Sequence, residues 1–556
     1  MRTYNEISDE DIYSDHTDSE EDSITEVSYK KNTHESKEAS KITVNVMNTQ
    51  YSLIKKVLQE TFRYRIITSS SEEWDLMWID TGVSLETFSK MKTYQKVNHF
   101  PSMKCLSRKD NLAKNLMRMR KYFPEKYNFF PLTWHLPNDY NDFREQLAQN
   151  RGKTYIVKPE AMSQGRGIYL TKSPEDVDIG ERRVVQRYIN DPYLIEGLKF
   201  DLRLYVLIYG CDPLRIYLYN EGLARLATEE YEQPSKYNIK NMYIHLTNYA
   251  INKNNDNFIF NTDEDETDTG HKRSLDFIWR YIDSHGGNSK QLQYKIKDLI
   301  IKTFCAVQPQ LAQPYRTSQP NSIENNMCFE ILGFDVLIDS NLNPWLLEVN
   351  HSPSFSTDTP FDHKVKEELI YDTIKLIHLD HNSKVMYRQQ RNIEFKSRAL
   401  GRTVHKMTKE KKEELKKRAM EVRDEYELKN LGGYARIYPD IEDKYEELIS
   451  LAEKIWEDVH GYKRHLTPRI SLKKTPTMQK GSLIIEKPTT KNIRRLARTN
   501  TRAPIKRELR RDSYKEVKQT IEDHIESIDK SLFSKVKGIS YITYSEWSNI
   551  KKIQII

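Results

Sequence analysis

The chain has 556 residues, of which 37% are hydrophobic and 11% aromatic, so it can form one large domain or two to three ordinary domains with tails. Charged residues make up 30% of the chain, which with few glycines and prolines excludes a collagen-like or globally disordered protein. The net charge of +7 is unevenly distributed, and four scattered cysteines without Cys-x-x-Cys spacing argue against a disulfide framework or a structural zinc site.

The chain begins with an acidic segment. Residues 1–29 contain ten acidic side chains and one basic side chain, Arg2, so we expect a disordered tail over residues 1–41. This start lacks the basic and apolar regions of a secretory signal. No window approaches 18 consecutive apolar residues, so we expect an intracellular protein without a membrane partner.

Two small domains are expected next. Residues 42–110 form an N-terminal domain, in which residues 42–46 alternate like a strand and residues 51–61 are typical of a helix. Residues 111–198 form a central domain, with strands predicted at 155–158, 168–171 and 183–188.

The central domain carries a glycine loop, Ser163-Gln-Gly-Arg-Gly167, between two predicted strands. Because no helix follows the glycines, the pattern is not a Rossmann or Walker loop. Its backbone N–H groups could still approach phosphates, with Lys158 at the end of the incoming strand as a fixed charge. The alternatives, a plain turn and a surface lysine, remain open.

A C-terminal domain is expected over residues 199–380. Strands are predicted at 201–209 and 214–219 and a helix at 292–306, which indicates an α+β fold with largely antiparallel sheets. Period-two alternation places Lys199, Asp201 and Arg203 on one strand face and Phe200 and Leu202 on the other. Such a charged face is also typical of an edge strand in contact with solvent.

Two apolar runs, residues 329–338 and 345–350, are separated by a turn-forming segment and predict a hairpin. If the loop closes symmetrically about Asn341 and Leu342, Asp335 lies opposite Glu348, and such like charges need a cation between them. Asn350 shares this face, and two carboxylates with an amide oxygen suit Mg²⁺. The alternative is that both acids are separately hydrogen-bonded or face solvent.

The C-terminal part is basic. Residues 384–423 contain fourteen Lys and Arg against five Asp and Glu, and residues 473–511 contain thirteen against two. We expect a cationic helical region over 381–470, which binds an anionic partner or packs as a solvated helix on the core, and a mostly disordered basic tail over 471–556. Nucleic acid is not the expected partner, because few aromatic residues interrupt the basic stretch.

Six ordered segments carry a family resemblance: KPEAMSQGRG, VVQRYI, KFDLRLYVLI, IHLTNYAINKNN, FEILGFDVLID and PWLLEVNHSPSF. With them the chain resembles the tubulin tyrosine ligase-like family, in its polyglutamylase branch. The resemblance implies an ATP-grasp fold in which two domains clasp ATP and Mg²⁺. It also implies ligation of free L-glutamate, through an acyl phosphate, to glutamate side chains or existing chains on acidic tubulin tails, with elongation favoured over initiation.

The resemblance also implies residue roles. Lys158, Arg225 and Glu348 would be catalytic, and Asp335, Glu348 and Asn350 would bind the metal. The incoming L-glutamate would contact Arg225, Tyr249, Lys272 and Lys366. The ATP contacts would be Lys158, Gln164, Gly165, Gln186, Arg187, Tyr188, Ile189, Lys199, Phe200, Asp201, Thr247 and Asn248.

The chain departs from the branch at Ala250 and His271, where serine is usual, and this puts amino-acid specificity in question. A ligase adding glycine or tyrosine and an inactive microtubule-binding protein therefore remain alternatives. The resemblance further implies a monomer that binds microtubules and lies in the cytoplasm and cytoskeleton, in a cilium, flagellum or basal body.

Overall fold

The computed structural model describes residues 42–160, 162, 164–401, 408–439 and 444–461, all within one compact unit of the chain, residues 1–467. The tails expected at 1–41 and 471–556 lie outside the described residues, as does part of the basic region at 381–470. None of the described helices is long and apolar enough to cross a membrane. Helices combine with three sheets in the described part, which confirms the predicted α+β class.

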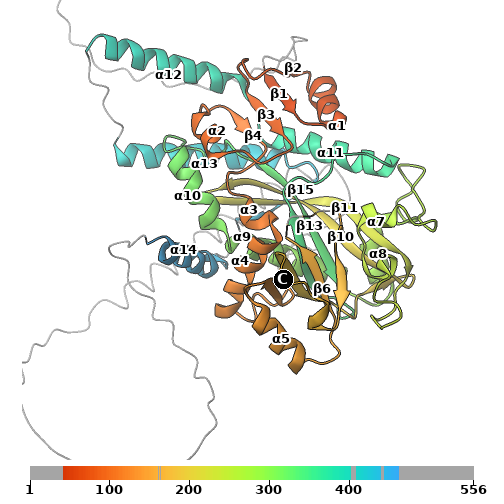
Figure 1. Cartoon of the computed structure of the whole chain (residues 1–556). Helices are drawn as coiled ribbons and strands as arrows, with labels where there is room; N and C mark the ends of the chain where they lie inside the picture. Colours follow the sequence, from red (N-terminus) through yellow and green to blue (C-terminus); the bar gives the residue numbers. More distant parts are fainter. Residues whose placement is uncertain (1–41, 161, 163, 402–407, 440–443, 462–556) are drawn as a thin grey trace, which may run out of the picture. The chain divides into compact units, whose positions relative to one another are not determined.

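The first sheet is parallel, in the order β2-β1-β3-β4 (Figure 1). This pairing differs from the antiparallel arrangement expected for most of the strands. The sheet and the helices that follow it comprise β1 (Thr43–Asn48), α1 (Ser52–Lys56), a π-helical turn (Val57–Thr61), β2 (Arg65–Ile67), β3 (Leu76–Ile79), α2 (Leu85–Lys90), β4 (Lys96–Val97), α3 (Lys104–Ser107) and α4 (Lys109–Tyr122).

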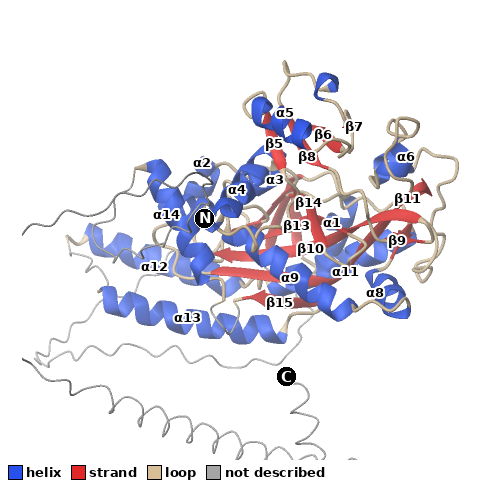
Figure 2. Ribbon diagram, turned by 90° about the horizontal axis from the view of Figure 1, so that it is seen from below, coloured by secondary structure: helices blue, strands red, loops and turns tan. Residues whose placement is uncertain are grey.

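The second sheet is antiparallel, in the order β5-β8-β6-β7, and Figure 2 shows it apart from the large sheet. Helix α5 packs on one face through Phe143, which contacts Trp134 and Tyr155 edge to face or tilted. The elements are β5 (Thr133–Leu136), α5 (Tyr140–Gln149), β6 (Tyr155–Pro159), β7 (Tyr169–Thr171), a 3₁₀ turn (Pro174–Asp176) and β8 (Arg183–Arg187).

The large sheet is antiparallel, with the central order β12-β11-β10-β13-β14 and with β9 and β15 added beside β10 and β11. Strand β15 comes from the basic region that was expected to be helical. The strands are β9 (Leu194–Ile195), β10 (Leu198–Cys211), β11 (Leu214–Glu230), β12 (Lys272–Arg273), β13 (Glu330–Ile338), β14 (Pro344–Asn350) and β15 (Tyr434–Tyr438).

Helices surround the large sheet (Figures 1 and 2). Several begin with a side chain that caps the first turn, such as Thr359 of α11, whose hydroxyl accepts from the N–H of Asp362 at 3.1 Å. The helices are α6 (Met242–His245), α7 (Tyr249–Asn252), α8 (Leu275–Ser284), α9 (Ser289–Cys305), α10 (Gln308–Ser318), α11 (Pro360–Leu376), α12 (His381–Ala399), α13 (Lys409–Lys429) and α14 (Glu446–His460).

Strand β10 organises the interior because its two faces differ. Phe200, Leu202 and the following even-numbered residues join a core with α4, α8, α9 and α10. On the other face, Tyr205, Leu207 and Tyr209 pack in a second core with α1 and α11. The same face begins with Lys199, Asp201 and Arg203, so apolar packing stops where a polar wall starts. Each fully buried apolar side chain stabilises the fold by about 1.5–3 kcal/mol, which holds the polar wall in register.

The predicted hairpin of β13 and β14 forms, and Asp335 lies opposite Glu348 as predicted. The register nearer the turn differs by one residue from symmetric closure, because Leu337 pairs with Trp345 and Val336 with Leu346. An irregularity at Leu347 then inserts one residue into β14, and this bulge restores the expected pair. The acidic pair is therefore produced by a bulge as well as by alternation.

Candidate active site

A cleft bordered by the second sheet and the large sheet brings together most of the residues predicted to contact ATP and metal. They come from β6, β8, β10, β13, β14 and the segment before α7, which lie far apart in the sequence. The predicted residues that line the cleft are Lys158, Gln186, Arg187, Tyr188, Ile189, Lys199, Asp201, Thr247, Asn248, Asp335 and Glu348.

Lys158 of β6 is buried and oriented by the neighbouring strand. Its Nζ donates to Gln186 Oε1 at 2.8 Å, and Gln186 Nε2 donates to Thr133 Oγ1 at 3.1 Å. Burial lowers the pKa of Lys158 to about 8, although the negative charge of Glu348 opposes the shift. A fixed ammonium group that is costly to bury favours an anionic ligand such as phosphate.

Lys199 of β10 is a second buried ammonium group. Its Nζ donates to the hydroxyl of Tyr188 and to the carbonyl of His245, each at 2.8 Å. Burial lowers the pKa of Lys199 to about 7, with Asp201 opposing the shift. Burial, with the charge of Lys199 as a second cause, also lowers the pKa of His245 to about 4, so this histidine stays neutral. The two lysines place positive charge on both sheets.

Charged residues form a row across five adjacent strands of the large sheet. Cross-strand pairing aligns Lys272 of β12, Arg225 of β11 and Asp201 of β10. Two residues further along β10, pairing aligns Arg203 with Asp335 of β13 and Glu348 of β14. Because directly paired residues share a sheet face, the antiparallel register, together with the bulge in β14, collects these six charges on one wall.

Asp335 is the centre of this row. Arg203 Nη2 donates to its Oδ2 at 2.9 Å, and Arg225 Nη2 lies 3.0 Å from the same oxygen. Arg225 also donates to both carboxylate oxygens of Asp201, at 2.8 and 2.6 Å. Burial by itself would raise the pKa of Asp335, but the two guanidinium groups hold it well below its usual range. Asp335 is therefore ionised at neutral pH.

The residues predicted to bind a metal fit a hard divalent cation. Asn350 Nδ2 lies 3.4 Å from Asp335 Oδ2 and 3.3 Å from Glu348 Oε1, so the three side chains converge. A half-turn of the amide would present its oxygen to a cation, giving the oxygen donors that Mg²⁺ prefers. Within the described residues, no group of three or more His, Cys, Asp and Glu side chains is arranged to hold a metal, so this site depends on two carboxylates and one amide.

Three predicted ATP contacts lie away from the cleft lining. Phe200 is fully buried in the apolar core, on the opposite face of β10 from Lys199 and Asp201. Its side chain faces away from the cleft, so the predicted contact of Phe200 with ATP would have to be made by its backbone. Gln164 and Gly165 lie in the glycine loop, both with positive φ of 62° and 77°. A Cβ on Gly165 would lie 2.4 Å from the end of the Ile251 side chain of α7, and the left-handed φ of Gly165 also favours glycine at this position.

The residues predicted for the incoming amino acid form a second group beside the cleft. Lys272 Nζ forms an ion pair with Asp362 and lies 3.7 Å from the ring centre of Tyr249. Lys366 Nζ donates to the carbonyl of Ser356 at 2.5 Å. Arg225, adjacent to Lys272 across the strands, is instead engaged by Asp201 and Asp335. The structure therefore brings the two lysines together and connects Arg225 to the acidic row.

Comparison with known proteins adds a family model, "Tubulin-tyrosine ligase family", which matches residues 87–386, more than half of the chain. The chain belongs to the tubulin-tyrosine ligase family. The matched residues include β5 to β14, and so the whole cleft described above. The family predicted from the six sequence segments is confirmed.

Three relatives share this family's features over most of the chain. "Probable beta-tubulin polyglutamylase" of Tetrahymena thermophila is 49% identical over 76% of this chain and 36% of its own length. "Tubulin polyglutamylase ttll6" of Danio rerio is 42% identical over 76% of this chain and 54% of its own length. "Tubulin polyglutamylase TTLL7" of Xenopus tropicalis is 37% identical over 76% of this chain and 50% of its own length. The chain spans about half or less of the length of the curated relatives it matches.

In this member of the tubulin-tyrosine ligase family, sequence reasoning missed the apolar walls of the cleft. Ile156, Ile168, Leu246, Leu337 and Leu347 line it beside the lysines. They stand in apolar runs that give no sign of which side chains face a cleft. Lys109 at the start of α4 was also missed, although its Nζ lies 3.5 Å from Glu348 Oε2.

Proposed function

We propose that this chain is a tubulin polyglutamylase, which uses ATP and Mg²⁺ to ligate L-glutamate to glutamate residues or chains on tubulin tails. The row of charges from Lys272 to Glu348, facing Lys158 across the cleft, is the observation that carries the proposal. Its cations and acids match a reaction between phosphates, a metal and carboxylates. The expected domains, 42–110, 111–198 and 199–380, would act as an ATP-grasp enzyme in which the second and third clasp the nucleotide.

The cleft supports ATP binding through two kinds of surface. Ile156, Ile168 and Leu337 provide apolar contacts for a flat base, next to the segment after β8 that lines the same cleft. Lys158 and Lys199 provide buried positive charge for phosphates. Bound ATP would supply the phosphoryl group that activates the acceptor carboxylate. The chain's part is to position the reactants and neutralise charge, because no nucleophile-base pair is needed for this chemistry.

Asp335, Glu348 and Asn350 would hold Mg²⁺, which would neutralise phosphate charge when bound. Arg203 and Arg225 contact Asp335 from the neighbouring strands and keep its carboxylate ionised. They would thereby preserve an oxygen ligand for the metal and a cationic border beside it. Lys158, Arg225 and Glu348 are the proposed catalytic residues, because they lie in or directly beside this charged row.

The two lysines beside the cleft support glutamate as the incoming amino acid. Lys272 and Lys366 are 4% and 6% exposed, and their ammonium groups share one partner, Asp362. The second carboxylate of glutamate would match the second cation, whereas glycine and tyrosine have no second carboxylate. Ala250 stands where serine is usual, and both residues are neutral. His271 also stands where serine is usual, and burial lowers the pKa of this histidine, which favours its neutral form. Neither difference removes a positive charge, so the cationic character is preserved.

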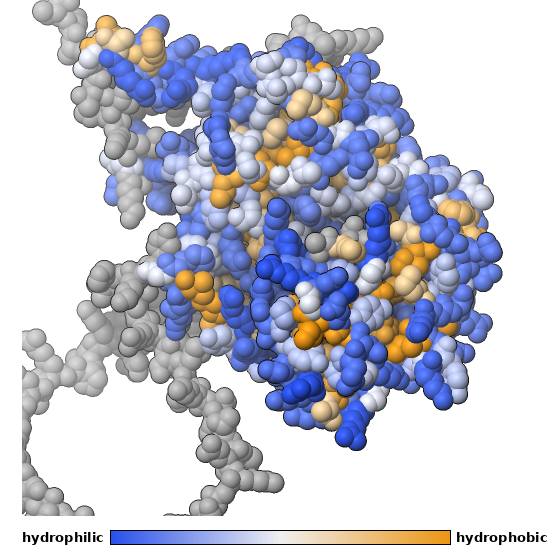
Figure 3. Space-filling view, in the orientation of Figure 1, coloured by the Kyte–Doolittle hydropathy of each residue, from blue (hydrophilic) through white to orange (hydrophobic). Residues whose placement is uncertain are grey.

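The basic helix α12 and the first half of α13, where lysine and arginine outnumber the acids, support a microtubule partner. Side chains of α13 are exposed at Lys411, Lys412 and Lys417, and α12 exposes Arg391 and Arg398 at 59% and 66%. At the end of α12, apolar residues are also exposed beside the hydrophilic surface (Figure 3), with Phe395 at 73%. Such a cationic surface would attract a polymer with acidic tails, and this attraction weakens with salt.

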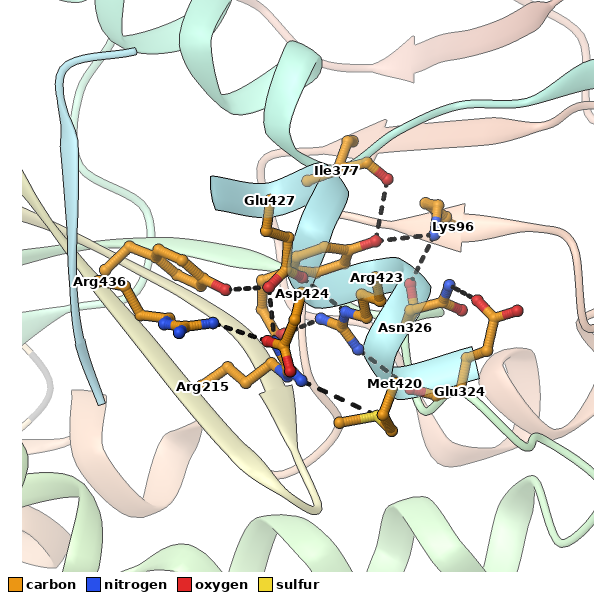
Figure 4. A network of polar contacts seen from close by, with 12 residues as sticks. Lys96, Arg215, Glu324, Asn326, Ile377, Met420, Arg423, Asp424, Glu427 and Arg436 are labelled. Carbon is orange, nitrogen blue, oxygen red and sulfur yellow. Dashed lines mark hydrogen bonds and ion pairs between the residues drawn. The ribbon is translucent and has the colours of Figure 1, made fainter. Parts of the chain in front are cut away.

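A buried network fixes α13 to the large sheet (Figure 4). Glu427 is 1% exposed and accepts from Arg215 Nη1 and Arg423 Nε, both at 2.6 Å, and from the hydroxyl of Tyr217. Arg423 in turn donates to the carbonyl of Tyr209 in β10. These contacts hold the C-terminal half of α13 against β10 and β11, so the basic residues of its other half extend from a rigid support.

Mass spectrometry of tubulin tails tests the proposal. The purified chain is incubated with microtubules, ATP, Mg²⁺ and, separately, glutamate, glycine or tyrosine. We expect glutamate, but neither glycine nor tyrosine, to be added. It should lengthen the chains on tails that already carry a branch, because elongation is the proposed activity. Addition of glycine or tyrosine instead would contradict the proposal that glutamate is the substrate. No addition of any amino acid would contradict the proposed ligase activity.

A further inference from the structure

One buried acid, Asp362, lies among the residues predicted to bind the incoming amino acid, and the proposed function gives it no role. Asp362 lies in the first turn of α11, between Lys272 and Lys366, and is 1% exposed. Its Oδ2 accepts a hydrogen bond from Lys272 Nζ, and its Oδ1 lies 3.4 Å from Lys366 Nζ. The three charges form a compact group of two cations and one anion.

Oδ1 of Asp362 is an unsatisfied acceptor. It is buried without a hydrogen-bond partner among the described residues, since the contact with Lys366 is an ion pair without hydrogen-bond geometry. A buried oxygen of this type is destabilising unless a donor reaches it. Beside the ion pair with Lys366, Oδ1 can therefore accept a hydrogen bond from a further donor.

Helix formation does not account for Asp362. A carboxylate in the first turn interacts favourably with the helix dipole, but this interaction does not require the carboxylate to be buried. Thr359 already caps α11 by accepting from the N–H of Asp362. Capping of α11 therefore does not explain why this carboxylate is buried between two lysines.

The charges of this group complement those of an acidic amino acid. L-Glutamate at neutral pH carries two carboxylates and one ammonium group, the reverse of two lysines and one aspartate. Lys366 is held by the carbonyl of Ser356, and Lys272 by the ring of Tyr249, so both cations have fixed positions. Lys272 also pairs across the strands with Arg225, which contacts Asp335. The group therefore lies next to the proposed metal residues.

We propose that Asp362 accepts a hydrogen bond from the amino group of the incoming amino acid and orients it toward the charged row. The inference rests on the proposed function, because it concerns the amine that this reaction consumes. It adds a specificity residue: Lys272 and Lys366 recognise carboxylates, whereas Asp362 recognises the amino group. A dicarboxylate without an amino group, such as glutarate, would satisfy the lysines alone.

Calorimetric titration of the full chain tests this, with Mg²⁺ and a non-hydrolysable ATP analogue present. L-Glutamate and glutarate are titrated separately into the unsubstituted chain and Asp362→Asn. We expect the unsubstituted chain to prefer glutamate by about tenfold or more, the usual effect of a hydrogen bond to a charged group. Asp362→Asn should lose this preference by weakening glutamate binding, with glutarate binding no weaker than before.

Glu367→Gln is the matched control, because Glu367 lies on the same helix but pairs with Lys56 and His363 near the surface. It should keep the preference for glutamate. The affinity of each variant for the ATP analogue and its thermal unfolding report whether the fold is intact. We expect no second substitution away from Lys272, Lys366 and Asp362 to restore the preference for glutamate in Asp362→Asn.

The outcomes separate the inference from the proposed function. If Asp362→Asn keeps the preference, or weakens both ligands equally, Asp362 is structural and the inference is overturned. If Asp362→Asn does not fold, the unsubstituted chain still decides, because equal binding of glutamate and glutarate also overturns the inference. Loss of glutamate incorporation by the unsubstituted chain would instead remove the proposed function.

Discussion

Replacing Glu348 by glutamine isolates the contribution of one carboxylate to the proposed metal site. Glu348 is the partner of Asp335 across the hairpin, and its side chain is 24% exposed. Glutamine keeps the size and one oxygen donor but removes the charge, so the pair with Asp335 loses half of its negative charge. The metal would then be held by one carboxylate and two neutral oxygens.

The expected cost to folding is small. Glu348 forms a 3.5 Å ion pair with Lys109 and a 3.3 Å contact with the Asn350 amide, and it also interacts with the side chain of Asp335. Partly exposed pairs of this kind contribute about 0–1 kcal/mol. Removing the charge opposite Asp335 also relieves repulsion between like charges. The free energy of unfolding of Glu348→Gln should therefore lie within about 1 kcal/mol of that of the unsubstituted chain.

The expected cost to activity is large. Loss of one preorganised charge in a site of this type commonly reduces the rate by about 10²–10³-fold. Radiolabelled glutamate incorporation into microtubules should therefore fall at least 100-fold, by this same reasoning. Binding to microtubules, measured by co-sedimentation, should remain nearly unchanged, since α12 and α13 are untouched.

A surface carboxylate is the control. Glu86 on α2 pairs with Lys90 at 2.6 Å, and both side chains are largely exposed, so Glu86→Gln should incorporate glutamate normally. Undiminished incorporation by Glu348→Gln would refute the metal assignment. Equal loss of incorporation and of microtubule binding would show that the substitution acts on the fold rather than on the site.

Three other predictions concern pH, charge and stability. Affinity for an ATP analogue should fall as pH rises from about 7 to 9, because Lys199 and Lys158 have pKa values lowered to about 7 and about 8 and lose their charge in this window; a flat fluorescence titration over this range would contradict their role as phosphate ligands. Replacing the lysines of α13, residues 411–417, by glutamate should reduce activity on microtubules most strongly at low salt while sparing glutamate addition to a soluble tail peptide, and salt-independent activity of the unsubstituted chain would exclude electrostatic capture. Glu427→Gln leaves Arg215 and Arg423 without their buried partner, so urea unfolding should show a loss of about 3–5 kcal/mol, and a change below about 1 kcal/mol would show that the network is replaceable.

Local sequence patterns predicted the hairpin and its acidic pair because they depend on short-range geometry. Side chains two residues apart share a strand face whatever the rest of the chain does, so Glu348 and Asn350 had to lie together. The same rule separated Lys199 and Asp201 from Phe200, and the buried position of Phe200 agrees with it. Its inclusion among ATP contacts came from its place in a motif, not from the alternation.

Long-range pairing was less accessible. The two-residue β12 has no periodicity of its own, yet it positions Lys272 beside Arg225 through its pairing with β11. Strand β15, Tyr434–Tyr438, has a strand-like composition within a region expected to be helical, and its pairing with β11 completes it as a strand. Such pairings are set by the partner strand, so the local sequence does not reveal them.

The sequence by itself determined the α+β class, the hairpin and the charged strand faces, because alternation and turn composition act between near neighbours. Six ordered motifs determined the family. Only the tertiary structure decided which charges meet. It placed Lys109 beside Glu348, anchored α13 through Glu427, and buried Asp362 between two lysines from different elements. Except for the Asp362–Lys366 pair within α11, these contacts join residues that are distant in the sequence, and packing of the cores around β10 brings them within reach of one another.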